Sequence, residues 1–120
     1  VAMAVVASPD YLAGAPPLAD PADLAAHRCI GLTLRSTGEP YQWEFAKDGR
    51  AVTVTLDSQL ASDDQELALA AAEAGLGLAY TTLGYAQPAL EAGRLVRVLE
   101  DWTPADERFY LYYQSRKNLP

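Results

Sequence analysis

The chain has 120 residues, half of them hydrophobic, and a formal net charge of −7 at pH 7. This length suits one domain or part of a larger one, and the apolar fraction is sufficient for a packed core. An acidic surface repels phosphate backbones, so this segment is not expected to contact nucleic acid. The single cysteine, Cys29, excludes an internal disulfide, which fits a reducing compartment such as the cytoplasm.

No segment is long enough to span a bilayer, so no membrane association is expected. Residues 1–7 form an apolar run that is too short, and too poor in flanking basic residues, for a signal peptide. The run is instead continuous and partly β-branched, which predicts a buried strand. Both ends of the sequence resemble cuts through a longer chain, and we therefore expect a fragment.

Two helix starts follow the first strand. Ser8 precedes Pro9, and Asp20 precedes Pro21. A small polar residue can cap a helix, and proline suits the next position because it lacks the N–H that would be unpaired there. We therefore predict two short helices in the first quarter of the chain.

The middle of the chain predicts mainly β-structure. Residues 29–34 read as a strand, and residues 41–46 and 51–56 read as two more. The last two are joined by a turn containing Asp48 and Gly49, which is a strong hairpin signal. This hairpin is expected to add an antiparallel element to the main sheet.

In the second half, residues 62–65 (SDDQ) predict a capping box, with the Ser62 hydroxyl accepting the Gln65 amide proton. Gly75 is the expected left-handed end of that helix. Alternating strands and helices predict an α/β fold with a mixed, mostly parallel sheet flanked by helices. The remaining predicted elements are strands over 76–80, 95–99 and 108–115 and a helix over 82–92 that contains Pro88.

Several short motifs, in this order, resemble the effector-binding domain of LysR-type bacterial transcription regulators. Each motif is a helix start, a turn or a strand, and none is specific alone. They cover nearly the whole chain. The motifs are SPDYL at 8–12, PADLAAHRCI at 21–30, WEF at 43–45, DGR at 48–50, SD at 62–63, GLGLA at 75–79, and LEAGRLVRVLEDW at 90–102.

The resemblance implies a two-lobed domain like a type 2 periplasmic binding protein, with a small effector bound between the lobes. Residues 8–107 would form the distal lobe, and residues 1–7 and 108–120 would cross toward the missing proximal lobe. The complete regulator would carry an N-terminal winged helix-turn-helix for DNA binding and would form a homodimer or tetramer. The segment Thr81-Thr82-Leu83-Gly84-Tyr85 departs from the family's usual proline-containing helix start, so the effector's identity cannot be carried over.

The candidate effector contacts lie at strand ends and at one helix start. Ligands in open α/β sheets bind at the carboxyl ends of strands. Arg35 follows such a strand and could bind a carboxylate of the effector through its guanidinium group, and an exposed loop arginine without a ligand is an equal alternative. Tyr80 could equally be part of the core. Asp63 suits the helix dipole and disfavours an anionic effector, and a dipole-matched first turn is its favoured interpretation. The candidates are Thr33, Leu34, Arg35, Ser62, Asp63, Tyr80 and Thr81.

No catalytic residue, metal site or cofactor is predicted. His27 has no second histidine or carboxylate at metal-ligand spacing, and its position after a short helix favours a structural role. Cys29 opens a buried strand, so a packed thiol is favoured over a nucleophile. The leading hypothesis is an effector-sensing domain of a cytoplasmic regulator; the alternatives are a lobe of a periplasmic solute-binding protein and, less favoured, an enzyme on a related scaffold.

Overall fold

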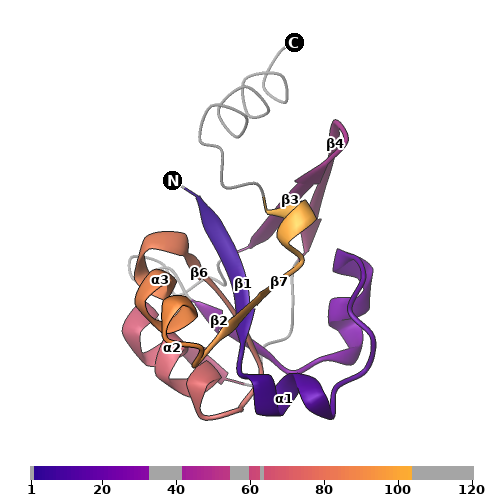
Figure 1. The fold of residues 1–120 in the computed structure, drawn as a ribbon. Helices are drawn as coiled ribbons and strands as arrows, with labels where there is room; N and C mark the ends of the chain where they lie inside the picture. Colours follow the sequence, from indigo (N-terminus) through magenta and orange to yellow (C-terminus); the bar gives the residue numbers. More distant parts are fainter. Residues whose placement is uncertain (1, 33–41, 55–59, 63, 104–120) are drawn as a thin grey trace.

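The computed structural model of the protein describes residues 2–32, 42–54, 60–62 and 64–103. At its centre is a five-stranded sheet with the order β5-β2-β6-β1-β7 (Figure 1). β2 runs parallel to β5 and β6, whereas β1 runs antiparallel to β6 and β7, so the predicted mixed sheet is confirmed. The strands are β1 Met3–Ala7, β2 Cys29–Leu32, β5 Leu60–Ser62, β6 Leu78–Thr82 and β7 Val96–Val98.

The predicted hairpin is present as β3 (Trp43–Lys47) and β4 (Arg50–Val54). Asp48 and Gly49 at the turn both have positive φ, at 51° and 79°, which matches the right-handed twist of the flanking strands. The expectation that the hairpin joins the main sheet is wrong. In the part of the chain that is described, the hairpin forms a separate two-stranded sheet, and β1 supplies the antiparallel element instead.

Both predicted helix starts in the first quarter are confirmed. The Ser8 hydroxyl accepts a hydrogen bond from the Tyr11 amide at 3.1 Å and caps α1 (Pro9–Ala13). The Asp20 carboxylate accepts from the Ala22 amide at 2.8 Å and caps η1 (Pro21–Ala26), a 3₁₀ helix. Each cap satisfies an amide that has no partner inside its helix.

Two longer helices follow, α2 (Gln65–Glu73) and α3 (Leu83–Glu91). The predicted Ser62 cap of α2 is wrong: Ser62 is the last residue of β5, and the cap is Asp64, whose carboxylate accepts from the Glu66 amide at 2.9 Å. Strand pairing holds the Ser62 backbone opposite Leu32, so the helix begins later. Gly75 ends α2 with φ of 84°, as predicted.

The last described element is η2 (Glu100–Trp102), a short 3₁₀ turn after β7. Arg97 of β7 holds this turn, since its guanidinium donates to the backbone oxygen and hydroxyl of Thr103 and lies 3.6 Å from the Glu100 carboxylate. The predicted strand over residues 108–115 and the predicted crossover over residues 108–120 lie outside the described residues.

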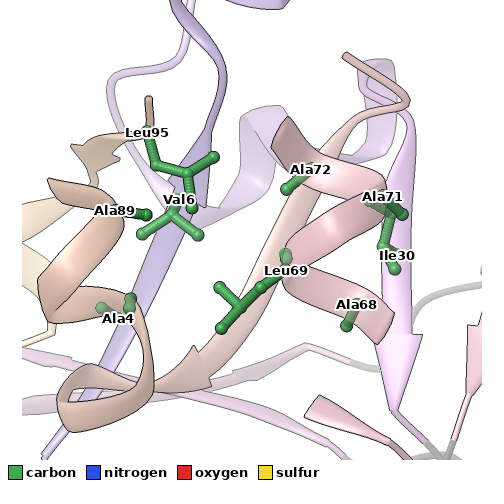
Figure 2. Close-up of a cluster of buried hydrophobic side chains, with 11 residues drawn as sticks. Ala4, Val6, Ile30, Ala68, Leu69, Ala71, Ala72, Ala89 and Leu95 are labelled. Atoms are coloured by element: carbon green, nitrogen blue, oxygen red, sulfur yellow. The ribbon is translucent and has the colours of Figure 1, made fainter. Parts of the chain in front are cut away.

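The sheet has a different layer on each face. Figure 2 shows Val6 of β1 and Ile30 of β2 packed on the first face among small side chains of α2 and α3. The opposite face, with Val5, Leu78 and Tyr80, packs against η1, the β3–β4 hairpin and η2. Alanines on α2 and α3 allow these helices to approach the sheet closely.

Gly77 marks a close approach between two backbones. A Cβ added at Gly77 would lie 2.5 Å from the Arg28 carbonyl oxygen, and the φ of Gly77 is 153°. The same carbonyl accepts the Leu78 amide at 2.9 Å. A glycine is therefore required where β6 begins beside β2.

Candidate functional site

One edge of the main sheet collects the ends of several strands. Because β2, β5 and β6 are parallel, their carboxyl ends, Leu32, Ser62 and Thr82, lie at the same edge. β1 is antiparallel to β6 and therefore begins there, with Met3 opposite Thr82. We call this the carboxyl edge, and it is the place where open α/β sheets bind ligands.

Both longer helices also begin at the carboxyl edge. α2 starts after β5 and α3 starts directly after β6. Gln65, the first residue of α2, accepts a hydrogen bond from the Thr82 amide through its Oε1 atom at 2.9 Å. Thr82 is the N-cap of α3 but forms no side-chain cap, and the Leu83 amide donates to the Ala2 carbonyl at 2.9 Å. Side-chain and backbone bonds thus join the starts of β1, α2 and α3.

Thr81 is a buried polar residue at this edge. It is 0 % exposed, and its hydroxyl oxygen has no hydrogen-bond partner. Successive side chains of a strand alternate between faces, so Thr81 lies on the same face as Ala79, beneath α2 and α3. A buried hydroxyl without a partner lowers stability, and among the described residues the Arg97 Nε and Trp102 Nε1 atoms are likewise buried without a partner.

Tyr80 lies on the opposite face and is 2 % exposed. Its ring stacks on Trp43 of β3 with centroids 5.3 Å apart. Its hydroxyl donates to the Glu44 carbonyl at 3.2 Å and accepts from the Glu44 amide at 3.3 Å. The described role of Tyr80 is therefore to fasten the hairpin to the sheet, and its direct contact with an effector stays a prediction.

The structure brings together some of the predicted contacts. The backbone of Ser62 and the side chain of Thr81 both lie at the carboxyl edge. Sequence reasoning missed Thr82, and it assigned Gln65 only to a capping box. The signal available in the sequence was Gln65 itself, a polar residue at the first position of α2. The predicted contacts outside the described residues are Thr33, Leu34, Arg35 and Asp63.

His27 and Cys29 occupy structural positions, as the sequence indicated. His27 Nδ1 lies 2.9 Å from the Tyr11 hydroxyl, and Nε2 lies 3.3 Å from the Pro17 carbonyl oxygen. Cys29 is buried, and its Sγ atom lies 3.8 Å from the Leu24 carbonyl oxygen. Burial raises the pKa of the Cys29 thiol to about 11. The thiol is therefore protonated at neutral pH and is a poor nucleophile.

The described residues contain no group of three or more His, Cys, Asp or Glu side chains that could hold a metal ion. None of their helices is long and apolar enough to cross a membrane.

A family model described as "LysR substrate binding domain" matches residues 1–120. A "Putative transcriptional regulator" of Pseudomonas aeruginosa strain PAO1 is 43% identical over 117 residues, covering 98% of this chain and 38% of the relative. The "HTH-type transcriptional regulator PgrR" of Escherichia coli K12 is 33% identical over 118 residues, covering 98% of this chain and 40% of the relative.

A solved structure has the same fold. It is the full-length Vibrio cholerae virulence activator AphB, described as a member of the LTTR protein family. Its TM-score is 0.74 with 24% sequence identity, over 86% of this chain and 34% of that chain. The present chain thus spans about two fifths of the length of the Pseudomonas aeruginosa and Escherichia coli regulators named above, and about a third of the AphB chain.

Proposed function

The chain belongs to the LysR substrate-binding domain family, and we propose that it is the effector-sensing part of a bacterial transcription regulator. The names of its relatives support this function over that of a periplasmic solute-binding protein. Residues 8–107 form the distal lobe in this proposal, and residues 1–7 and 108–120 lead to a proximal lobe. A winged helix-turn-helix elsewhere in the regulator binds DNA.

The carboxyl edge is the observation that carries the proposal. Strand ends and two helix starts, from segments far apart in the sequence, meet there and are joined by the bond between Gln65 and Thr82. Helix N-termini and strand ends present backbone groups that can bind a small polar molecule. Neither His27 nor Cys29 offers an activated nucleophile or base at this edge, so the proposed activity is binding rather than catalysis.

In the proposed mechanism, the effector binds between the two lobes and favours one arrangement of lobes and subunits. A ligand shifts such an equilibrium only by its difference in affinity for the two arrangements. The shift would change the spacing of the DNA-binding domains in a cytoplasmic homodimer or tetramer. This segment, with its acidic balance, would contact neither nucleic acid nor membrane. The proposed effector contacts remain Thr33, Leu34, Arg35, Ser62, Asp63, Tyr80 and Thr81.

The test uses the complete regulator that contains this chain. A thermal-shift screen of amino acids, aromatic acids and sugars identifies a ligand, and DNase footprinting then measures promoter occupancy with and without it. We expect the ligand to change the length or position of the footprint. A ligand that binds this domain and leaves both the footprint and transcription unchanged contradicts the proposal.

A matched pair of substitutions tests the assigned contacts. Arg35→Ala is expected to weaken ligand binding about tenfold, the factor that follows from losing one hydrogen bond to a charged group. Arg50→Ala, at the exposed first residue of β4, removes the same charge and is expected to leave binding unchanged. Equal effects of the two substitutions contradict the role of Arg35.

A further inference from the structure

We propose that Gln65 is a specificity-determining residue of the effector site, and that its side-chain N–H groups donate to a carbonyl or carboxylate oxygen of the effector. The inference rests on the proposed function, which places the effector at the carboxyl edge. It adds the chemical class of the ligand group and the residue that selects it.

The contact with Thr82 fixes the orientation of the Gln65 amide. A backbone N–H can only donate a hydrogen bond, so the Gln65 atom 2.9 Å from the Thr82 nitrogen is the oxygen. The amide nitrogen, Nε2, then points away from Thr82 with two protons to donate. Nε2 has no hydrogen-bond partner among the described residues, and Gln65 is half-buried. Gln65 therefore presents two unpartnered N–H donors at this edge, while its oxygen accepts from the Thr82 amide.

Thr81 is a second and independent observation. Its hydroxyl is fully buried without a partner, on the face covered by α2, and it precedes Thr82 in the same strand. The hydroxyl therefore lies beside the Gln65 contact. An oxygen atom bound by Gln65 at this point would also give the Thr81 hydroxyl an acceptor, after a small outward movement of the first turn of α2. A hydroxyl can donate or accept a hydrogen bond, so Thr81 can bind the same ligand oxygen as Gln65 by donating its proton.

The neighbouring charges bear on the choice between the two oxygen types. Asp64 caps α2, and Glu66 follows Gln65, so two acidic residues flank the donor. They oppose a carboxylate, whereas the helix N-terminus favours one. A neutral carbonyl avoids the repulsion. We therefore expect an amide to bind at least as tightly as the corresponding carboxylate.

The test is an NMR titration, with three small probes, of the ¹⁵N-labelled complete effector-binding domain that contains this chain and the proposed proximal lobe. Acetamide carries a neutral carbonyl, acetate carries a carboxylate, and ethylammonium carries donors only. Acetamide and acetate are expected to shift the Gln65 side-chain signals and the Thr81 and Thr82 amide signals. Ethylammonium is attracted by the Asp64 and Glu66 carboxylates, so it is expected to shift the backbone amide signals of those two residues and not the Gln65 side-chain signals. The relative response to acetamide and acetate distinguishes the two oxygen types.

Three variants separate the ligand role from a structural one. Gln65→Glu keeps an oxygen for Thr82 but removes the N–H donors, so probe binding should weaken about tenfold while the fold is retained. Gln87→Glu makes the same change on the exposed part of α3 and should bind like wild type. Thr81→Val removes the unpartnered hydroxyl, so it should raise the unfolding midpoint and weaken probe binding. If Thr81 had only a structural role, the substitution would not raise stability and weaken probe binding at the same time.

The inference is overturned if neither oxygen probe shifts the Gln65 signals, if ethylammonium acts equally, or if Gln65→Glu binds like wild type. None of these readouts involves DNA. If the complete regulator still responds to an effector, such a failure removes only the assignment of Gln65. If the probes bind as expected but no ligand changes promoter occupancy, the proposed function fails and the binding chemistry stands.

Discussion

The Tyr80 hydroxyl makes hydrogen bonds with both the amide and the carbonyl of Glu44. One side chain of the main sheet therefore pairs with the backbone of β3 much as a neighbouring strand would. This contact joins the two sheets through a buried aromatic residue, with Trp43 and Phe45 packed around its ring. The hairpin depends on Tyr80 for its position.

Tyr80→Phe tests this dependence. The substitution preserves the ring packing and removes both hydrogen bonds, so we expect the free energy of unfolding to fall by about 1–3 kcal/mol. Urea denaturation measures the loss. The matched change Tyr85→Phe, on an exposed residue of α3, should alter stability little. A Tyr80→Phe protein as stable as wild type, with an unchanged hydrogen-exchange rate at the Glu44 amide, contradicts the role of this bond.

Gly77→Ala tests the close approach of β6 to β2. The added methyl group would meet the Arg28 carbonyl oxygen at 2.5 Å, and backbone atoms cannot move aside cheaply. We expect a loss of about 1–3 kcal/mol, typical of overpacking in a core. Gly84→Ala is the control, because a methyl group there meets nothing within 4 Å. Comparable losses in the two variants, measured by thermal unfolding, contradict the steric argument.

Thiol labelling tests the environment of Cys29. The ordinary thiol pKa of 9.0 rises to about 11, so the thiolate fraction near neutral pH falls about a hundredfold. The buried thiol should react with an aromatic disulfide reagent only when the chain unfolds, and adding urea should release the reaction. Stoichiometric labelling of the folded protein at neutral pH disagrees with this expectation.

The same thiol predicts the sign of an alkaline pH effect. Its folded-state pKa is raised, so its stabilising contribution is complete below pH 9.0 and is lost as the pH rises toward about 11. The unfolding midpoint should therefore fall over this interval. Cys29→Ala removes the titrating group and should reduce the slope. An unchanged slope in that variant assigns the alkaline loss to other groups.

Asp23 predicts an acidic effect of the opposite kind. The Ala19 amide donates to its carboxylate at 2.8 Å and the Asp20 amide does so at 3.2 Å, and these bonds lower its pKa from 3.8. Its contribution to stability is present above the unfolded-state pKa and is lost as the pH falls through the folded-state value. Asp23→Asn should flatten the acidic limb of the stability curve.

Local features of the fold could be predicted from the sequence. The Ser8 and Asp20 caps, the Asp48-Gly49 turn and the Gly75 helix end each depend on a few adjacent residues and their backbone preferences. The ordered motifs also identified the family, which the comparison confirms. Short-range chemistry was sufficient for these predictions.

Long-range features could not be predicted in the same way. β1 is an apolar run that would suit a parallel or an antiparallel central strand, and only its partners set its direction. The position of the separate hairpin depends on its contact with Tyr80, which lies 36 residues from Glu44. Ser62 looked like a cap because its pairing with Leu32 is invisible in the local sequence. The hydrogen bond between Gln65 and Thr82 could not be predicted either, because the two residues are far apart in the sequence.

The central place of β1 has a consequence for biosynthesis. Among the described strands of the main sheet, β1 is translated first and its partners β6 and β7 are translated last, and Met3 and Thr82 are 79 residues apart. On the ribosome, the apolar residues of β1 therefore remain unpaired with β6 and β7 until nearly all of the described chain has been translated. Hydrophobic segments exposed in this way attract chaperones and invite aggregation. Slow translation should therefore harm the yield of folded protein more than it would for a fold that pairs its strands in order of synthesis.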